Sequence, residues 1–253
     1  MRFRYSFLLL LIFASPNFLN AQAHDAGHAW TYQGADGPSH WGDLKPEYAT
    51  CKIGIGKHQS PIDIRNAQPA DLPPIQFDYK PAPLHIIDNG HSIQVNYPAG
   101  SSIQVGNKQY MLKQFHFHRP SEELIDGKRH DMVAHLVHSD SDGNLAVVAV
   151  LFSKSTANAL VDELWKNLPA EKEKESIVDN VQINVADLLP LDHGYYTYTG
   201  SLTTPPCSEN VTWFVLKTAS SLSASEIKQF GKIYPRNARP VQPLNDRVIQ
   251  QTK

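Results

Sequence analysis

Cysteine is scarce in this chain, which has two in 253 residues. Two cysteines are too few for a small disulfide-scaffolded protein or for a zinc site built from thiolates. An excess of charge of one sign is also missing, and the net charge of −2 gives no general attraction to nucleic acid or acidic lipid. We therefore expect no nucleic-acid partner. The charged fraction of 19% and the hydrophobic fraction of 41% exclude a disordered or fibrous chain.

Long apolar runs are missing as well, and the one short run lies at the N-terminus. Arg2 and Arg4 precede an apolar stretch over residues 7–14, which is too short to span a bilayer. Residues 21–23 (Ala-Gln-Ala) form a small-x-small cleavage site. This arrangement is typical of a secretory signal peptide over residues 1–23. No other stretch of the sequence predicts a membrane span, so we expect none in the mature protein.

Export determines the chemistry of the two cysteines. After cleavage, we expect residues 24–253 to form one domain in the periplasm or outside the cell. An oxidising compartment favours a disulfide over two free thiols for an isolated pair of cysteines. The sequence therefore predicts a bridge between Cys51 and Cys207, which would close a loop of roughly 156 residues.

Short strand patterns dominate the mature chain, and helical patterns are few. Helices are predicted over 157–168 and over 225–233, where a serine cap begins the second. Strands and helices do not alternate, so we predict one mixed domain built on a large, mainly antiparallel sheet. Most predicted strands are bounded by Gly, Pro, Asn or Asp; they are 84–87, 92–97, 101–105, 108–118, 132–139, 145–153, 195–199 and 210–218.

Twelve histidines are present, and three of them fall on two of these predicted strands. Alternation of side chains along a strand places Gln114, His116 and His118 on one face, and His135 lies on a second strand. If the two strands are antiparallel neighbours, the three imidazoles meet over one point. Three imidazoles without a thiolate are typical of a catalytic zinc site, whose vacant fourth position holds a water with a lowered pKa.

A structural role for these histidines stays open on spacing alone. A lone His-x-His on a strand is more often a pair of surface or buried structural histidines than a metal site. The third histidine brings the two interpretations to about even weight. The remaining motifs of the chain decide between them.

A series of motifs runs in order along the mature chain: Gly37-Pro38-Ser39-His40-Trp41, Gln59-Ser60-Pro61-Ile62-Asp63-Ile64, Asn89-Gly90-His91, Gln114-Phe115-His116-Phe117-His118, Ser121-Glu122, His135-Leu136-Val137-His138, Ser201-Leu202-Thr203-Thr204-Pro205-Pro206-Cys207, Val211-Thr212-Trp213 and Asn237-Ala238-Arg239-Pro240. With these motifs in this order, the chain from Trp30 to Leu244 resembles an α-class carbonic anhydrase of the exported, bacterial type. The resemblance implies a mainly β (α+β) single domain on a large twisted, mostly antiparallel central sheet with short peripheral helices. It also implies reversible hydration of CO2 to bicarbonate and a proton by a zinc-bound hydroxide.

The resemblance also implies a role for each residue of the site. Catalysis falls to His91 as proton shuttle and to Thr203 and Glu122, whose hydrogen bond would orient the hydroxide. The cysteine pair looks like the disulfide of exported members. The implied Zn2+ ligands are His116, His118 and His135, and Gln114 would orient His116 through a hydrogen bond. The implied substrate site consists of Val137, Val147, Leu202, Thr203, Thr204 and Trp213, and the implied proton-transfer network consists of Tyr32, Asn89 and Gln94.

Two positions depart from the family pattern. Val133 stands where the family usually has a glutamate, two residues before the third ligand, and Glu123 stands where a histidine is frequent. Loss of a hydrogen-bond partner behind a metal ligand typically costs 10–100-fold in metal affinity or activity. We therefore expect either weaker zinc binding or mutual compensation, because both changes lie near the zinc site in the family register.

Two other functions remain as alternatives. One is a catalytically weak or silent carbonic-anhydrase-like binding module, although such members typically lack one or more of the zinc histidines. The other is zinc storage, which favours clustered, flexible histidine tracts over ligands on ordered strands. The oligomeric state is open, with a homodimer among the options.

Overall fold

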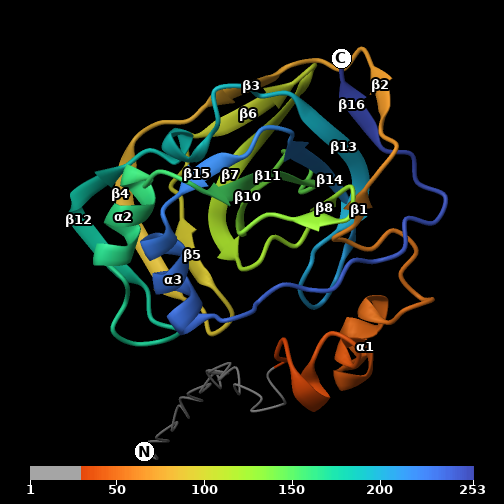
Figure 1. Cartoon of the computed structure of the whole chain (residues 1–253), viewed down its shortest axis with the longest axis horizontal. Helices are drawn as coiled ribbons and strands as arrows, with labels where there is room; N and C mark the ends of the chain where they lie inside the picture. The colour runs from red at the N-terminus through yellow and green to blue at the C-terminus, as the bar shows by residue number, and fades with distance from the viewer. Residues whose placement is uncertain (1–29) are drawn as a thin grey trace, which may run out of the picture.

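The computed structural model describes residues 30–253, so the predicted signal peptide lies outside the described residues. Within the described part, the strands form a 13-stranded mixed sheet and a separate three-stranded sheet. Figure 1 shows the large sheet at the centre of the molecule with the helices at its periphery. The predicted fold class, a single mainly β domain with short peripheral helices, is confirmed.

Three long strands form the middle of the large sheet. They are β7 (Lys108–His118), β10 (Met132–Ser139) and β11 (Leu145–Lys154), and β10 pairs antiparallel with both of the others. On the β7 side the order continues through β5 (Ile93–Asn96), β4 (Ala82–Asp88) and β12 (Ser176–Ile183). On the β11 side it continues through β14 (Glu209–Leu216), β13 (Tyr195–Ser201), β16 (Gln250–Thr252) and β2 (Gln68–Ala70).

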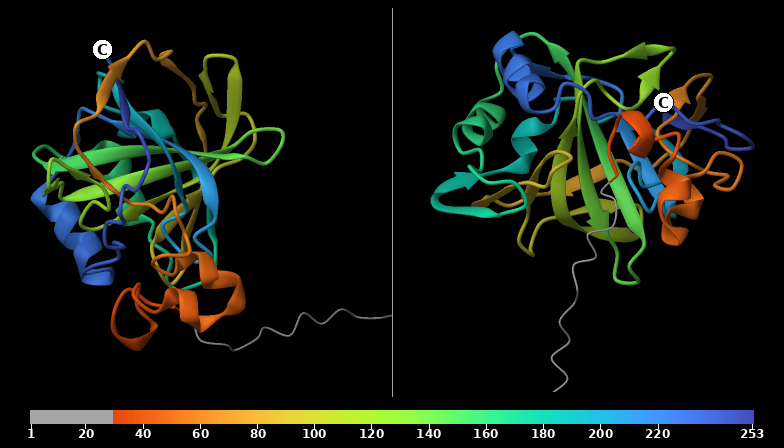
Figure 2. Two further views of the ribbon diagram at one scale, coloured as in Figure 1. Left: turned by 90° about the vertical axis from the view of Figure 1, so that its right-hand side faces the viewer. Right: turned by 90° about the horizontal axis from the view of Figure 1, so that it is seen from below.

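Most pairings in this sheet are antiparallel, as the sequence predicted. The parallel exceptions are β11 with β14, β11 with β15 (Ser220–Leu222), and β16 with β2. β6 (Ser102–Val105) joins β7 to β3 (Ile75–Asp78). The second sheet consists of β1 (Asp63–Ile64), β8 (Leu124–Ile125) and β9 (Lys128–Arg129). Figure 2 shows how strongly the large sheet twists and curves.

The helices are short and lie at the edges of the sheet. α2 (Ala159–Lys166) begins at Asn158, whose side chain accepts from the Val161 amide. α3 (Ala224–Ile233) begins at Ser223, which forms a reciprocal capping box with Glu226. The cap is therefore two residues earlier than the predicted start at 225. The other short helices are η1 (Gly34–Asp36), α1 (Trp41–Leu44), η2 (Pro46–Cys51) and η3 (Val185–Leu188).

Apolar side chains cover both faces of the central strands. Phe115 and Phe117 of β7 point into the larger core, which also contains Trp165 of α2 and Phe230 of α3. A smaller apolar cluster on the other side contains Val147 and Trp213, among others. Because β10 lies between these two clusters, most of its side chains are buried. The site described below lies on the side of the smaller cluster.

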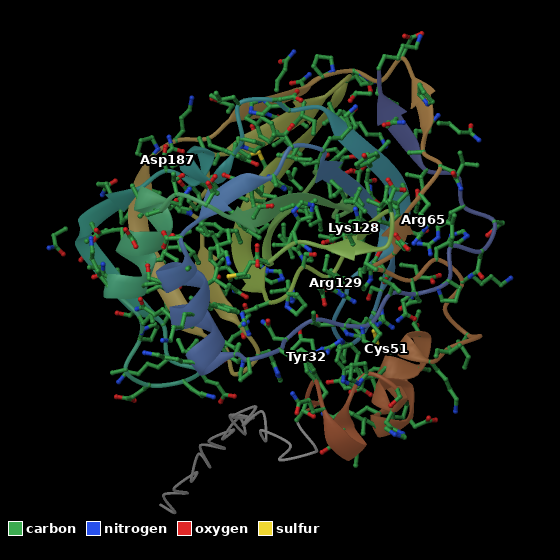
Figure 3. All side chains as sticks on the ribbon, viewed as in Figure 1. Tyr32, Cys51, Arg65, Lys128, Arg129 and Asp187 are labelled. Carbon is green, nitrogen blue, oxygen red and sulfur yellow. A yellow bond between two sulfur atoms is a disulfide. The ribbon has the colours of Figure 1, made fainter. Side chains whose placement is uncertain are left out.

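The predicted disulfide is confirmed and lies beside the N-terminal helices. Cys51 and Cys207 are joined, and both are buried against Trp41. Tyr32 packs against the same cluster, and Figure 3 shows Tyr32 and Cys51 below the sheet on the side of the orange helices. In residues 30–253, no helix is both long and apolar enough to cross a bilayer.

Candidate active site

The three predicted ligand histidines come together in the structure. The register of β7 and β10 places His116 directly opposite His135, and Val133 opposite His118. One ligand nitrogen from each of His116, His118 and His135 lies within 4.8 Å of the other two. His118 and His135 are each 1% exposed, so water has little access behind them. The antiparallel neighbours on which the three-histidine prediction depended are thus confirmed.

Each imidazole has one nitrogen held by a hydrogen-bond acceptor. Nδ1 of His116 lies 2.8 Å from Oε1 of Gln114, and Nδ1 of His118 lies 2.7 Å from the carbonyl oxygen of Asn237. Nε2 of His135 lies 2.9 Å from Oε1 of Glu123. A nitrogen that faces an acceptor carries the proton in the neutral ring, so the opposite nitrogen has the lone pair. This leaves Nε2, Nε2 and Nδ1 as the three possible ligand atoms.

The electrostatic environment keeps two of the rings neutral. Burial, with the neighbouring His135, lowers the pKa of His116 to about 3. Burial also lowers the pKa of His118 well below its usual range. Burial acts on His135 in the same direction, but the carboxylates of Glu123 and Glu122 outweigh it and raise its pKa. Neutral imidazoles are the form that binds metal ions.

The arrangement fits a zinc ion. Zinc in catalytic sites takes three protein ligands, and three histidines form one of the recurring sets. Nε2 of His118 is buried and has no hydrogen-bond partner among the described residues. A buried polar atom without a partner is costly, and a metal ion at the meeting point of the three rings would satisfy it. The trio is thus able to hold a metal, as the sequence predicted.

Glu122 and Thr203 lie beside the trio. Oε2 of Glu122 is 3.6 Å from Nε2 of His118 and 3.9 Å from Nδ1 of His135. Oε1 accepts the backbone N–H of Arg239 at 2.6 Å. Burial raises the pKa of Glu122 to about 7, against the lowering effects of His135, the Thr203 hydroxyl and the Arg239 amide. The Arg239 amide therefore fixes Oε1, whereas Oε2 has no hydrogen-bond partner among the described residues; the nearby Thr203 hydroxyl acts on the carboxyl group by lowering its pKa.

The four predicted wall residues form one surface beside His135. Val137 pairs with Val147 across β10 and β11, and Val147 pairs with Trp213 across β11 and β14. Leu202 packs against the same cluster, and the rings of Trp213 and His135 are 4.9 Å apart. Thr204 follows in the 202–208 loop, where its carbonyl accepts from the Cys207 amide at 2.9 Å. The geometry brings these residues together, while their roles toward substrate stay predictions.

His91 occupies the loop between β4 and β5. The Asn89 side chain accepts the His91 amide at 3.0 Å and donates to Oε1 of Gln94 at 3.1 Å. Gln94 pairs with His116 across β5 and β7, so this polar pair runs toward the trio. The His91 ring stacks on Trp30 with centroids 3.6 Å apart, and partial burial lowers its pKa.

Tyr32 belongs to the same polar region. Its hydroxyl is buried and has no hydrogen-bond partner in the described part of the chain. Burial, together with the charge of Glu122, raises the pKa of Tyr32 well above its usual value. The hydroxyl therefore stays protonated and keeps a proton to donate.

Sequence reasoning missed three contacts of this site. The Asn237 carbonyl that holds His118 and the Arg239 amide that holds Glu122 belong to a motif noted only for the resemblance. The contact between Glu123 and His135 could not be read from spacing, because it joins a loop residue to a strand. The Glu123 substitution was nevertheless a visible signal, since it departs from the family pattern near the metal site.

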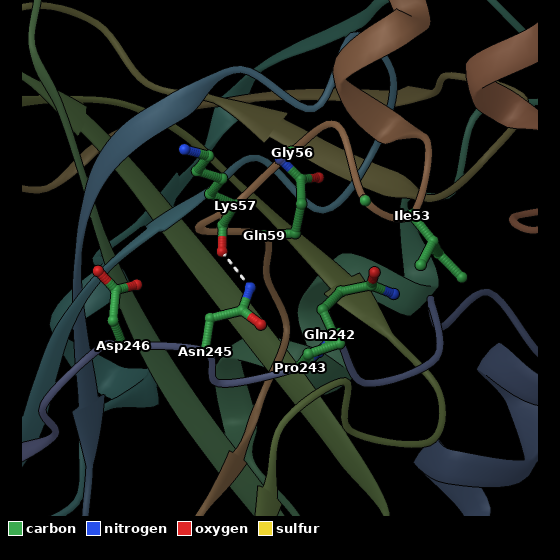
Figure 4. Close-up of a pocket in the computed structure, with 9 residues that line it drawn as sticks. Ile53, Gly56, Lys57, Gln59, Gln242, Pro243, Asn245 and Asp246 are labelled. Atoms are coloured by element: carbon green, nitrogen blue, oxygen red, sulfur yellow. Dashed lines mark hydrogen bonds between the residues drawn. The ribbon is translucent and has the colours of Figure 1, made fainter.

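A separate hollow of about 500 Å³ lies away from the three histidines. It lies between residues 53–59 and residues 242–246, and none of the three histidines lines it. Figure 4 shows the side chain of Asn245 donating to the Lys57 carbonyl across this hollow, at 2.6 Å. The hollow is therefore not the predicted metal site.

Comparison with known proteins agrees with the geometry. The profile described as "Eukaryotic-type carbonic anhydrase" matches residues 36–253. A relative from Nostoc sp. named "Carbonic anhydrase" is 42% identical over 225 residues, covering 87% of this chain and 84% of the relative. A solved structure of a hyperthermostable carbonic anhydrase from an active hydrothermal vent chimney superposes with a TM-score of 0.85. It has 47% identity and covers 89% of this chain and 100% of the other.

A second solved structure is the α-carbonic anhydrase of Thermovibrio ammonificans in complex with the inhibitor sulfanilamide. It superposes with a TM-score of 0.84 at 42% identity, and the match covers 88% of this chain and 99% of the other. The profile spans most of the chain, and the identities lie well above those that show a fold alone. With three histidines converging on the same sheet, the chain belongs to the eukaryotic-type (α) carbonic anhydrase family.

Proposed function

We propose that this chain catalyses the reversible hydration of CO2 with a zinc ion held by His116, His118 and His135. The convergence of their three free nitrogens is the observation that carries the proposal. When bound, zinc supplies Lewis acidity that makes water a nucleophile near neutral pH. Everything else in the reaction falls to the surrounding side chains.

Thr203 and Glu122 orient the nucleophile in this proposal. Glu122 receives the Arg239 amide on Oε1, which leaves Oε2 for the Thr203 hydroxyl. A threonine that donates its proton to a carboxylate can only accept at its oxygen on the other side. Thr203 therefore accepts a hydrogen bond from the attacking oxygen and turns its lone pair toward the substrate, which is an orientation effect.

The apolar wall holds the substrate. CO2 is linear and nonpolar, and Val137, Val147, Leu202 and Trp213 present an apolar surface next to His135. Thr204, one residue beyond Thr203, would bond the bicarbonate product. The wall thus excludes water from the attack side, while the threonines supply the polar contact.

Proton removal falls to His91. Hydration releases a proton, and a group with a pKa near neutrality transfers it to buffer more readily than bulk water does. Asn89 and Gln94 form a hydrogen-bonded pair between the His91 loop and the strand of His116. Together with Tyr32 they would order the waters along which the proton moves.

Residues 1–23 direct export to the periplasm, or secretion, in this proposal. The Cys51–Cys207 disulfide supports an oxidising compartment. Cleavage after Ala23 leaves residues 24–253 as the catalytic domain. Assembly as a homodimer stays a prediction, which analytical ultracentrifugation of the mature protein tests.

The assignment is tested by measuring zinc content and CO2 hydration in His118→Ala. We expect one zinc per chain in the wild type and loss of most zinc and activity in the variant. His193→Ala, which changes an exposed histidine, is the matched control and should keep both. Full zinc occupancy in His118→Ala would contradict the ligand assignment. A wild type that holds zinc and shows no hydration would instead favour the silent binding module.

A further inference from the structure

Glu123 is a buried carboxylate to which the proposed reaction assigns no step. Its side chain is fully buried, and Oε1 lies 2.9 Å from Nε2 of His135. The residue directly precedes β8, where the Leu124 amide donates to the Ile62 carbonyl at 3.2 Å. The Ser121 hydroxyl donates to the Glu123 carbonyl at 2.8 Å. The backbone on both sides therefore holds the carboxylate in place.

β10, the strand that carries His135, has no hydrogen-bond acceptor that could replace Glu123. Val133 lies two residues before His135 on the same face, and its side chain packs in the smaller apolar cluster. The backbone of β10 is paired with β7 on one side and with β11 on the other. An acceptor for the Nε2–H of His135 must therefore come from outside the strand, and Glu123 provides it.

The position of Glu123 is costly for a residue with only a structural role. A buried carboxylate needs strong hydrogen-bond partners or a nearby cation. Glu123 lies beside a second buried carboxylate, Glu122, and its Oε2 has no hydrogen-bond partner within residues 30–253. Arg129 is close, but its Nη1 donates to the backbone carbonyls of Ser121 and Glu122. A divalent cation held by His135 would supply the compensating charge.

We propose that Glu123 is the positioning residue of His135. It accepts the Nε2–H, holds the ring in the tautomer that presents Nδ1 to the metal, and does this from the segment before β8. A carboxylate at position 133, usual in the family pattern, becomes unnecessary, so the two departures compensate each other. The inference rests on the proposed function only in that His135 is a metal ligand.

The test is the rate of zinc release from the zinc-loaded mature protein into an excess of a chromophoric chelator. Glu123→Gln keeps the shape of the side chain and removes its charge. We expect it to release zinc on the order of 10–100-fold faster than the wild type. Glu226→Gln is the matched control, because Glu226 is also a buried, hydrogen-bonded carboxylate but belongs to the cap of α3. It should release zinc at the wild-type rate.

A relocation variant separates positioning from a structural effect. Glu123→Ala should release zinc at least as fast as Glu123→Gln. Adding Val133→Glu to Glu123→Ala returns a carboxylate to the face of His135 and should restore most of the slow release. A double variant as fast as Glu123→Ala alone would contradict the exchange of roles.

One measurement on the wild type needs no variant. Imidazole nitrogen NMR of the zinc-loaded protein should show His135 protonated at Nε2, with a slowly exchanging proton, and bound through Nδ1. Binding through Nε2, or zinc release unchanged in Glu123→Gln, overturns the role of Glu123 and leaves the proposed function intact. A wild type that binds no zinc overturns both.

Discussion

Replacing His138 by glutamine should make the protein less sensitive to acid. His138 is fully buried on the core face of β10, opposite to the face of His135, and its Nε2 lies 3.0 Å from the Tyr79 hydroxyl. Burial lowers the pKa of His138 to about 3, although the carbonyls of Leu136 and Ala146 act in the opposite direction. The ring is therefore neutral in the folded protein at every pH above that value.

The magnitude follows from proton linkage. In the unfolded chain a histidine takes up a proton near pH 6.5, while the buried ring takes up none until about pH 3. Between these values the unfolded state binds one proton more, so the free energy of unfolding falls as the pH falls, by about 1.4 kcal/mol per unit. From pH 7 to pH 5 this single group removes about 2 kcal/mol of stability.

The assay is urea unfolding of zinc-loaded wild type and His138→Gln at pH 7 and pH 5. Glutamine can keep the hydrogen bond to Tyr79 and does not titrate, so the variant should lose about 2 kcal/mol less than the wild type over this interval. Its absolute stability is not the readout, because the substitution also changes packing. His193→Gln, on the surface, should follow the wild type. An equal loss in His138→Gln and wild type would refute the reasoning.

Three further predictions concern the reaction and the disulfide. His91→Ala should lower kcat on the order of 10- to 100-fold in weak buffer and leave kcat/KM near the wild-type value, since that ratio does not include the final proton transfer. Added imidazole should restore kcat, and an unchanged kcat in the variant would exclude His91 as the proton shuttle. Thr203→Ala should lower both parameters about 10²-fold with no rescue by imidazole, because it removes a hydrogen bond at the reacting atoms; rescue would contradict its role. Thiol titration of natively exported protein, denatured without a reductant, should find no free thiol, and two reactive thiols would disprove the bridge. The double variant Cys51→Ser, Cys207→Ser should lose about 4–5 kcal/mol of stability, because the bridge closes a long loop.

The central strands were predictable because they are long, rich in β-branched and aromatic residues, and bounded by Gly, Pro, Asn or Asp. The bounds of β7 and β10 agree with the predicted 108–118 and 132–139, and their pairing brings the three histidines together. The short strands β1, β8 and β9 were not predicted. Strands of two residues carry no periodicity, and their pairing is decided by the packing of distant segments.

In the site, too, some residues could be predicted from the sequence and others could not. The histidines and Gln114 follow from alternation on one strand and its neighbour, and Gln114 does contact His116. The contacts of His118 with Asn237 and of His135 with Glu123 join segments far apart in the sequence or in different elements. Such contacts depend on how loops fold back on the sheet, which no local pattern specifies. The cap of α3 was placed at 225 because a serine stands there too, and only the reciprocal bond with Glu226 identifies Ser223.

The most direct test of the central claim is a zinc titration of the chelated mature protein, followed by stopped-flow CO2 hydration. The three nitrogens form one site in the described chain, so activity should be near zero without metal, rise linearly with added zinc, and level off at one zinc per chain. Hydration that persists without zinc, levels off at another ratio, or stays absent in the loaded protein would contradict the account.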